Sequence, residues 1–475
     1  MHCIDGQWIA GTGARFTSTN PATEEDLWQA NAASDDDVAA AFVSAATAQA
    51  DWDALGWEKR AGYLKRFAEL AAAKSDFLAN TIADEVGKAL WDATTEAKAV
   101  AAKCDVTIDA YQNLRDTTQF TNAKMSGRVG YRPLGVTAVI GPFNFPAHVA
   151  NGQIMPSLLA GNTVVFKPSE LSPLVAEETV KLWHEAGLPP GVLNLVQGAV
   201  PTSQAILRQP QLRGLFFTGS RITGGKIREA LAQRLEVLLA LELGGNNPLI
   251  AHQVSDLDQA VDTIIKSAFM TSGQRCTCTR RLIVTGDSQP LLDKLIEQTE
   301  AVTIGLPRDP SNPFMGPLIH AAAVDKVLNV QQRMLADGGV SLVEAKRQPL
   351  GNAFVSPGII DVTNSSGRTD EETFGPLLQV IRVDDLSAAI HEANNTQYGL
   401  VAGILCDDRV DFDRFRNEVR AGLLNWNLPT TGASGQLPFG GVGQSGNYRP
   451  AGYHAINFCH VPVAEVEAVP AEGNA

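Results

Sequence analysis

Short apolar runs alternate with helix-like stretches between residues 136 and 241, and this alternation restricts the possible folds more than any other feature of the sequence. The runs predict strands at 136–140, 163–166, 192–196, 214–217 and 236–241. The stretches between them predict helices at 149–160, 174–186, 203–209 and 223–234. Strands separated by helices of this length form a parallel sheet with helices on both faces. We therefore expect a doubly wound α/β unit.

The flanking sequence predicts a second α/β unit and an extra hairpin. Helices rich in Ala, Leu, Glu and Lys are expected before the first unit, at 35–52, 57–73, 75–88 and 91–115. After a junction near 243–255, further helices are predicted near 288–301, 321–336 and 385–395, with strands near 282–285 and 400–405. Residues 116–135 read as an extended hairpin. Together with the tail after Gly446, this hairpin is a candidate oligomerisation unit.

Charge and cysteine content narrow the class of protein. The net charge of −14 over 475 residues argues against nucleic acid or an anionic membrane as the main partner. Six mostly scattered cysteines fit a reducing compartment better than a disulfide framework. The sequence has no signal-peptide pattern and no apolar run of the roughly 20 residues that a membrane helix needs. These features predict a cytoplasmic protein.

Cys276 lies in a short polar segment beside Arg275, after an apolar, helix-like approach. A thiol near a cation can acquire a lowered pKa and act as a nucleophile. A buried, inert cysteine is the alternative, since most intracellular cysteines are of that kind. The Cys276-x-Cys278 spacing does not predict a metal site, because structural zinc needs about four ligands and neither a second cysteine pair nor a nearby histidine supplies them. A cysteine hydrolase would require a histidine base, and no histidine motif supports one.

Two further residues could take part in chemistry at such a thiol. Glu242 ends the apolar run 238–243 just before two glycines, where burial should raise its pKa and suit it to act as a general base. Asn144 lies between two aromatic residues in a proline-rich turn, where its amide could donate to a developing oxyanion. An edge carboxylate facing water and an ordinary turn asparagine are the alternatives.

Candidate nucleotide-binding residues follow two of the predicted strands. Gly219 and Ser220 lie between a strand and the helix predicted from 223, where free N–H groups and the helix dipole favour a pyrophosphate. Lys167 and Glu170 follow another strand and could bind ribose hydroxyls. An ordinary turn or a solvated loop is the alternative for each. The literal Gly-x-Gly-x-x-Gly at 441–446 neither follows a clear strand nor opens a helix, and is interpreted as a loop.

These stretches, in this order, resemble the NAD(P)-dependent aldehyde dehydrogenase superfamily. The ones that carry the resemblance are Gly141-Pro-Phe-Asn-Phe-Pro146, Lys167-Pro-Ser-Glu170, Phe217-Thr-Gly-Ser220, Leu241-Glu-Leu-Gly-Gly245, Gly273-Gln-Arg-Cys276, Glu372-Thr-Phe-Gly-Pro376 and Leu437-Pro-Phe-Gly-Gly441. The resemblance implies an aldehyde dehydrogenase-like α/β fold with three parts. These are a Rossmann-like NAD-binding domain (1–115 and 136–243), a catalytic domain (244–446), and an oligomerisation hairpin and tail (116–135 and 447–475). A homodimer or homotetramer is expected.

The resemblance also assigns expected roles. Cys276 would be the nucleophile, Asn144 would bind the oxyanion and Glu242 would activate water, and the presence of this base favours hydrolysis over acyl transfer to coenzyme A. The cofactor, expected to be NAD with NADP not excluded, would be bound by Lys167, Glu170, Gly219, Ser220, Gly224, Glu372 and Phe374. No metal is expected. A carboxylate at Glu170 near the adenine ribose would repel a 2′-phosphate, which favours NAD.

Further stretches, including Gly244-Gly-Asn-Asn-Pro248 and Asn425-Trp-Asn427, are similar to one group of the family. That group oxidises a semialdehyde with two carboxylates in arginine breakdown. Phe143 differs from the residue that is usual at its position in the group. The stretch 147–150 also differs from the pattern of the group. Because the chain is acidic, such a substrate calls for local cations, and the candidates are Arg275, Arg281 and Arg449. The alternatives are another aliphatic or acidic aldehyde, or a non-catalytic dinucleotide-binding protein on the same fold.

Overall fold

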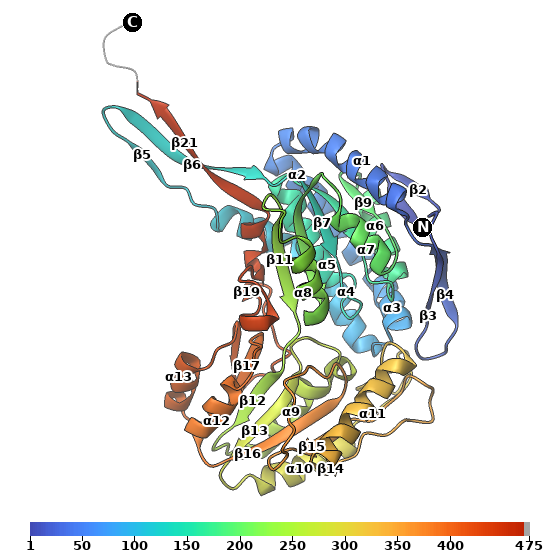
Figure 1. Cartoon of the computed structure of the whole chain (residues 1–475), viewed down its shortest axis with the longest axis vertical. Coiled ribbons are helices and arrows are strands. Elements are labelled where there is room, and N and C mark those ends of the chain that lie inside the picture. The colour runs from blue at the N-terminus through green and yellow to red at the C-terminus, as the bar shows by residue number, and fades with distance from the viewer. Residues whose placement is uncertain (470–475) are drawn as a thin grey trace, which may run out of the picture.

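Two seven-stranded sheets form the centre of the chain, which the computed structural model describes over residues 1–469 (Figure 1). The first sheet has the strand order β11-β10-β7-β8-β9-β1-β2. Its parallel strands are β7 (Val136–Ile140), β8 (Thr163–Lys167), β9 (Leu193–Leu195), β10 (Leu212–Gly219) and β11 (Leu238–Leu243). β1 (His2–Ile4) and β2 (Gln7–Ile9) add an antiparallel edge. Every residue of β7 and β8 is buried, as expected for strands covered on both faces.

The helices of the first unit confirm the predicted alternation, with ends shifted by a few residues. Those that follow the strands are α5 (His148–Ala160), α6 (Pro173–Glu185), α7 (Val200–Leu207) and α8 (Arg221–Ala230). Those that precede them are α1 (Asp35–Ala54), α2 (Trp57–Ala73), α3 (Ser75–Val86) and α4 (Leu90–Asn113). α8 begins earlier than predicted because the Ser220 side chain caps its N-terminus by accepting from the N–H of Thr223.

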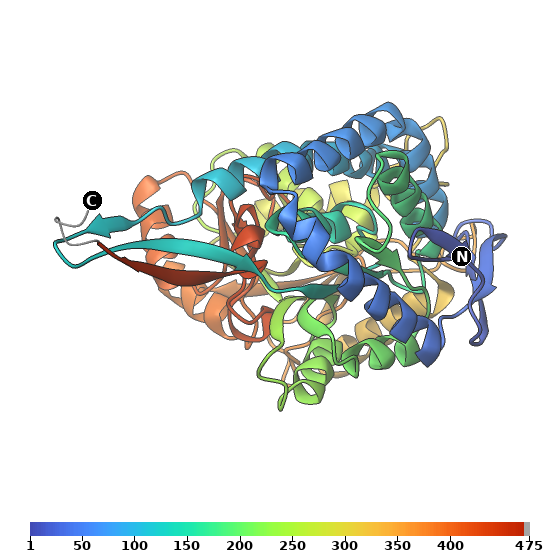
Figure 2. The same cartoon turned by 90° about the horizontal axis from the view of Figure 1, so that it is seen from above.

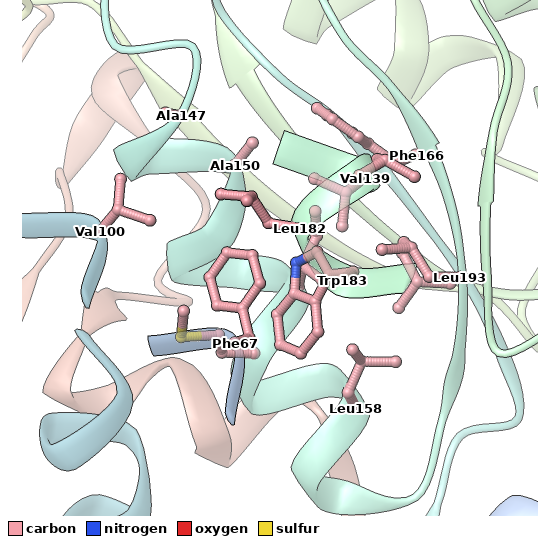
Figure 3. Packing of buried hydrophobic residues seen from close by; sticks show 14 of the residues in the cluster. Phe67, Val100, Val139, Ala147, Ala150, Leu158, Phe166, Leu182, Trp183 and Leu193 are labelled. Atoms are coloured by element: carbon pink, nitrogen blue, oxygen red, sulfur yellow. The ribbon is translucent and has the colours of Figure 1, made fainter. Parts of the chain in front are cut away.

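The core of this unit joins the early helices to the sheet. Phe67 of α2 stacks on Trp183 of α6 with ring centroids 3.9 Å apart, and Val139 and Phe166 of the sheet belong to the same cluster (Figure 3). The indole N–H of Trp183 donates to Asn151 Oδ1 at 3.0 Å, so the one polar atom of this ring is paired. Buried aromatic surface of this size holds the helices at fixed positions against the sheet.

The second sheet has the order β14-β15-β16-β13-β12-β17-β18 and is parallel except at β14. Its strands are β12 (Asn247–Ala251), β13 (Thr279–Thr285), β14 (Val340–Val343), β15 (Gly358–Asp361), β16 (Leu377–Val383), β17 (Val401–Leu405) and β18 (Leu423–Trp426). Its helices are α9 (Leu257–Phe269), α10 (Gln289–Glu300), α11 (Ala321–Ala336), α12 (Leu386–Asn394) and α13 (Arg409–Glu418). The second α/β run is thereby confirmed.

A long hairpin-like sheet projects from the body (Figure 2). β6 (Met125–Pro133) pairs with β5 (Gln119–Thr121) and, over its whole length, with β21 (His460–Ala468). The predicted hairpin is therefore present, and part of the tail extends it. Between them, the 3-10 helix η3 (Tyr453–Phe458) packs into the core of the first unit, while residues 470–475 of the tail lie outside the described residues.

Small two-stranded sheets complete the described chain. They are formed by β3 (Arg15–Thr19) with β4 (Asp26–Asn31), and by β19 (Pro438–Phe439) with β20 (Ala451–Gly452). Over residues 1–469, no helix is both long and apolar enough to cross a bilayer.

Candidate active site

The carboxyl ends of β7, β8, β10 and β11 meet at one edge of the first sheet. Ile140, the last residue of β7, is in register with Lys167, and Thr218 of β10 is in register with Glu242. Asn144 follows β7 in the turn that leads into α5. Parallel strands thus bring Asn144, Lys167 and Glu242 to the edge where open α/β sheets bind ligands.

The segment before Cys276 has an unusual backbone. In the 3-10 helix η1 (Met270–Gly273), Thr271 and Ser272 have φ values of 55° and 54°, a left-handed conformation that costs a non-glycine residue about 1–3 kcal/mol. Hydrogen bonds hold both residues in place. The Thr271 hydroxyl donates to Asp92, and the Ser272 hydroxyl donates to the carbonyl of Gly316 at 2.7 Å. The chain therefore turns sharply just before the thiol.

Gly273 brings the cysteine segment against the segment 372–376. A Cβ at Gly273 would lie 2.3 Å from the carbonyl of Gly375, so only glycine permits this approach. Arg280, which is fully buried, connects the same segments. Its guanidinium donates to the carbonyls of Gly375 (3.2 Å) and Arg275 (3.0 Å), and lies 3.8 Å from Glu372 Oε1. Two stretches that are about a hundred residues apart in sequence are thus one structural unit.

Two asparagine amides hold the backbone around Cys276. Asn144 Nδ2 donates to the carbonyl of Gln274 at 2.8 Å. Asn247 Nδ2 donates to the carbonyls of Cys276 at 2.7 Å and Cys278 at 2.9 Å. Sequence reasoning did not single out Asn247, although the paired asparagines after Gly244-Gly245 were a visible signal. These bonds place Asn144 next to the cysteine segment and fix the carbonyl of the cysteine itself.

The Cys276 thiol has a raised pKa, contrary to the lowered pKa expected beside a cation. Burial, followed by the charges of Glu372 and Glu242, raises the pKa of Cys276 to about 12. Arg275 does not oppose this effect, because its guanidinium pairs with Asp92 at 2.6 Å. The expectation of a lowered pKa is therefore wrong for this structure, and the thiol is protonated at neutral pH. Cys278 is buried and its Sγ lies 3.7 Å from the carbonyl of Met270.

Glu242 and Glu372 are the carboxylates whose charges contribute to the raised pKa of the Cys276 thiol. Burial raises the pKa of Glu242 well above its usual range, which confirms the prediction for this residue. Its Oε1 accepts from the N–H of Ala451 at 3.4 Å, while its Oε2 is buried and has no hydrogen-bond partner within residues 1–469. Burial also raises the pKa of Glu372, although Arg280 partly offsets the effect. A buried carboxyl with a free oxygen beside a thiol is suited to proton transfer.

Lys167, Glu170, Gly219 and Ser220, which were expected to bind the nucleotide, lie along the same edge of the first sheet. Lys167 is buried, and burial lowers its pKa to about 8. Its Nζ donates a hydrogen bond to the carbonyl of Pro168 at 2.6 Å and lies 3.9 Å from the Glu170 carboxylate. The N-terminus of α8 begins directly after Gly219 and Ser220. At the other side, Glu372 Oε1 is buried without a hydrogen-bond partner in the described chain. An ammonium group, a helix N-terminus and a carboxylate oxygen without a hydrogen-bond partner fit the ribose and phosphate groups of a dinucleotide.

Further contacts surround these residues. A Cβ at Gly224 would lie 2.6 Å from Leu243 Cδ2, so this glycine lets α8 approach β11 closely. Phe374 meets Phe143 edge to face with ring centroids 5.9 Å apart. Phe143, the departure noted in the sequence, therefore contacts one of the residues expected to bind the cofactor.

The Gly-x-Gly-x-x-Gly stretch is a loop, as interpreted, and it connects the two sheets. Gly446 forms an antiparallel bridge with Glu242, and Asn447 accepts from the N–H of Leu241 and donates to the carbonyl of Leu239. On the other side of the loop, Ser445 Oγ accepts a hydrogen bond from the N–H of Gly399 at 3.0 Å. The glycines serve close packing here.

The three arginines proposed for the substrate lie in different places. Arg281 is buried and donates to the carbonyls of Asn246, Glu392 and Ala393, so its guanidinium is used in the second unit. Arg275 is paired with Asp92 and lies over the Phe145 ring, 5.0 Å from its centroid. Arg449 is exposed, two residues before Ala451. Within residues 1–469, no group of three or more His, Cys, Asp or Glu residues is arranged to hold a metal ion.

Comparisons with known proteins agree with this geometry. Residues 8–462 match a family model described as the aldehyde dehydrogenase family. The N-succinylglutamate 5-semialdehyde dehydrogenase of Paraburkholderia xenovorans (strain LB400) is 46% identical over 467 residues, which cover 98% of this chain and 96% of the relative. The solved structure of succinate-semialdehyde dehydrogenase from Burkholderia pseudomallei has a TM-score of 0.93 at 33% identity and covers 98% of both chains. The NADP-dependent glyceraldehyde-3-phosphate dehydrogenase from Bacillus halodurans C-125, complexed with NADP, has a TM-score of 0.93 at 29% identity and covers 99% of both chains.

Proposed function

Because this chain belongs to the aldehyde dehydrogenase family, we propose that it oxidises N-succinyl-L-glutamate 5-semialdehyde to N-succinyl-L-glutamate with NAD as the hydride acceptor. The family implied by the motif order is thereby confirmed, and the protein is an aldehyde dehydrogenase that uses a nicotinamide dinucleotide. The observation that supports the catalytic part of the proposal is that burial, and then the charges of Glu372 and Glu242, raise the pKa of Cys276, so the two carboxylates lie close enough to act on the thiol. The substrate rests on the relative that is 46% identical over nearly the whole chain.

In the first step, the Cys276 sulfur attacks the aldehyde carbon and the carbonyl oxygen becomes an oxyanion. The Asn144 amide has two N–H donors, and one of them is used by the carbonyl of Gln274. The other N–H and the backbone N–H of Cys276 are the proposed donors to the oxyanion. Because the raised pKa keeps the thiol protonated, its proton passes to a solvent water molecule as the sulfur attacks.

A bound NAD would supply the hydride acceptor for oxidation of the thiohemiacetal, and Cys276 would then hold the acyl group as a thioester. Lys167 and Glu170 would hold the adenine ribose, the N-terminus of α8 with Gly219 and Ser220 the pyrophosphate, and Glu372 and Phe374 the nicotinamide side. The Glu170 carboxylate favours NAD, since it would repel the 2′-phosphate of NADP.

In the last step, Glu242 takes a proton from a water molecule that attacks the thioester, and the acid is released. The buried Oε2 of Glu242 has no protein hydrogen-bond partner within residues 1–469, so it is available to a water molecule. A carboxyl with a raised pKa is a stronger base once it is ionised. Glu242 therefore regenerates the thiol and completes the turnover.

The test is NADH formation, followed by absorbance, with N-succinylglutamate semialdehyde, other acidic semialdehydes and neutral aldehydes, each with NAD and NADP. The proposal requires the highest kcat/KM with the succinylated substrate and NAD. A higher kcat/KM with another aldehyde would mean that this aldehyde is the substrate. A preference for NADP would mean that NADP is the cofactor. Loss of every signal would contradict the reaction class.

We also propose that the sheet of β5, β6 and β21 joins copies of the chain into a homo-oligomer. Its projection from the body and its length of paired backbone support this use. Light scattering after size exclusion checks it, and a monomer at micromolar concentration would contradict it.

A further inference from the structure

Lys103 of α4 is buried, with 7% of its surface exposed, and the mechanism above does not use it. Its Nζ forms no hydrogen bond and no ion pair with a residue of the described chain. Burial lowers the pKa of Lys103 to about 8, so its ammonium form still predominates at neutral pH. An unpaired buried cation destabilises a fold, and such a group persists where it serves a ligand.

Lys103 lies beside α5, at a place further along this helix from the turn that carries Asn144. Glu96 of α4 accepts from the N–H groups of Ala147 and His148 at 3.1 Å each, so this part of α4 faces the start of α5. Lys103 lies seven residues, or about two turns, further along α4. A Cβ built on Gly152 of α5 would lie 3.3 Å from Lys103 Cε and 3.7 Å from its Nζ. The missing side chain at Gly152 thus makes room for the lysine between the helices.

His148 shares the face of α5 that carries Gly152, since the two are four residues apart. Its Nδ1 is buried and has no hydrogen-bond partner within residues 1–469. Burial, with added repulsion from Lys103 and Lys88, lowers the pKa of His148 to about 3, and its hydrogen bond to the backbone of Ala99 only partly opposes this shift, so the ring is neutral beside the lysine. Because this ring is neutral, Lys103 is the positive charge that a carboxylate would meet here.

The other charged side chains near Lys103 form ion pairs with one another. Lys88 and Glu96 form a fully buried ion pair at 2.5 Å, and Arg275 pairs with Asp92 at 2.6 Å. Lys103 is left as the buried positive charge between α4 and α5 without a counter-ion in the described chain. Both helices meet at the turn that presents Asn144, the proposed oxyanion donor. A carboxylate on the substrate would supply the missing counter-ion.

We infer that Lys103, which lies beside the neutral His148 ring, binds a carboxylate of the substrate that is remote from the aldehyde. This inference rests on the proposed function and adds the residues that select an anionic aldehyde. It also replaces Arg281 as a candidate, because the guanidinium of Arg281 is occupied elsewhere. Gly152 belongs to the same site, since a side chain there would press against the lysine and displace its end.

Lys103→Met removes the charge and keeps the apolar stem, and Lys98→Met is the matched control, because Lys98 is an exposed lysine on the same helix. We expect Lys103→Met to lower kcat/KM for N-succinylglutamate semialdehyde about 10- to 100-fold, the usual effect of losing a charged hydrogen bond. The loss should appear mainly in KM. With pentanal, which has no carboxylate, kcat/KM should change little, and Lys98→Met should behave as the wild type with both substrates.

Thermal unfolding separates this role from a structural one. Removal of an unpaired buried cation should leave the fold as stable as the wild type or more stable, whereas a structural lysine would destabilise it when replaced. Equal losses with pentanal and the anionic aldehyde, or unchanged discrimination in Lys103→Met, would overturn the inference. Lys103→Gln, a polar neutral variant, provides the same comparison if the methionine variant does not fold.

Failure of the proposed function gives a different result. If the wild type does not oxidise N-succinylglutamate semialdehyde but does oxidise succinate semialdehyde, the substrate assignment falls. The role of Lys103 is then decided by the ratio of kcat/KM for succinate semialdehyde to that for pentanal in the same variants. A ratio unchanged from the wild type would overturn it, and a lowered ratio would support it.

Discussion

Glu242 forms an antiparallel bridge with Gly446, so the proposed general base on the first sheet lies directly beside a loop that the second unit holds. The base is thus fixed from both sides of the crevice. Asn447 adds to this contact by pairing with the free edge of β11, in the place of a neighbouring strand. The loop therefore determines how the base is presented to the thiol.

Asn447→Ala should destabilise the protein by about 1–3 kcal/mol, because the buried N–H of Leu241 and the carbonyl of Leu239 lose their partners. Activity should fall as well, since Glu242 follows Leu241 directly. Chemical unfolding and steady-state kinetics check both effects. Tyr448→Ala is the matched control, because Tyr448 is 70% exposed and next in sequence. Equal stability of the two variants would contradict the role of Asn447.

Glu242→Gln should separate the two halves of the reaction. Attack by Cys276 and hydride transfer can proceed, but hydrolysis of the thioester loses its base, so steady-state turnover should fall roughly 100- to 10,000-fold. Rapid mixing with NAD and aldehyde should still give a burst of about one NADH per active site. A variant with full steady-state activity would show that another group activates water.

The pH dependence of hydrolysis should follow Glu242. Its pKa is raised by burial, and the group acts as a base only when ionised, so the rate should increase with pH through that raised pKa and then level off. The residual rate of Glu242→Gln should lack this step. Single-turnover measurements of acid release across pH test the prediction, and a rate that falls as pH rises would contradict it.

Cys276 should react slowly with iodoacetamide at neutral pH in the absence of ligands. The thiolate is the reactive form, and burial with the charges of Glu372 and Glu242 raises the pKa of the thiol to about 12. The alkylation rate should therefore keep increasing above pH 9 without a plateau at neutral pH. Mass spectrometry of the labelled peptide, with Cys278→Ser as control, measures it. A plateau near neutral pH would show that the resting site holds a thiolate.

Lys103 should make the stability of the wild type depend on alkaline pH. Its pKa is lowered from 10.5 to about 8, so between these values the unfolded chain binds more protons and stability increases as pH rises. Lys103→Met lacks this contribution, and its advantage over the wild type should shrink by up to about 3 kcal/mol across that range. Urea unfolding of both proteins at several pH values gives the difference. A constant difference would mean that the lysine is solvated and keeps its ordinary pKa in the folded protein.

The alternation of strands and helices could be predicted from the sequence because each signal is local. The raised pKa of Glu242 could also be predicted, since the apolar run and two glycines that bury it are adjacent. The pKa of Cys276 could not, because the direction of Arg275 is set by Asp92, which is 183 residues away. Lys103 resembles any exposed helical lysine in the sequence, and its burial depends on Gly152 of another helix. Contacts between residues far apart in the sequence determine the electrostatics of the site, whereas local sequence patterns determine the helices and strands.

The return of the C-terminal segment to the first core has a consequence for protein engineering. Ala455, Ile456 and Phe458 are buried in the same cluster as the helices and strands near the N-terminus, and the carbonyl of Cys459 accepts from Asn162 at 2.6 Å. A chimera that exchanges the N-terminal half between relatives at a single crossover near residue 244 would separate these residues from their packing partners. Recombination therefore needs two crossovers, with residues 453–459 inherited together with the N-terminal half.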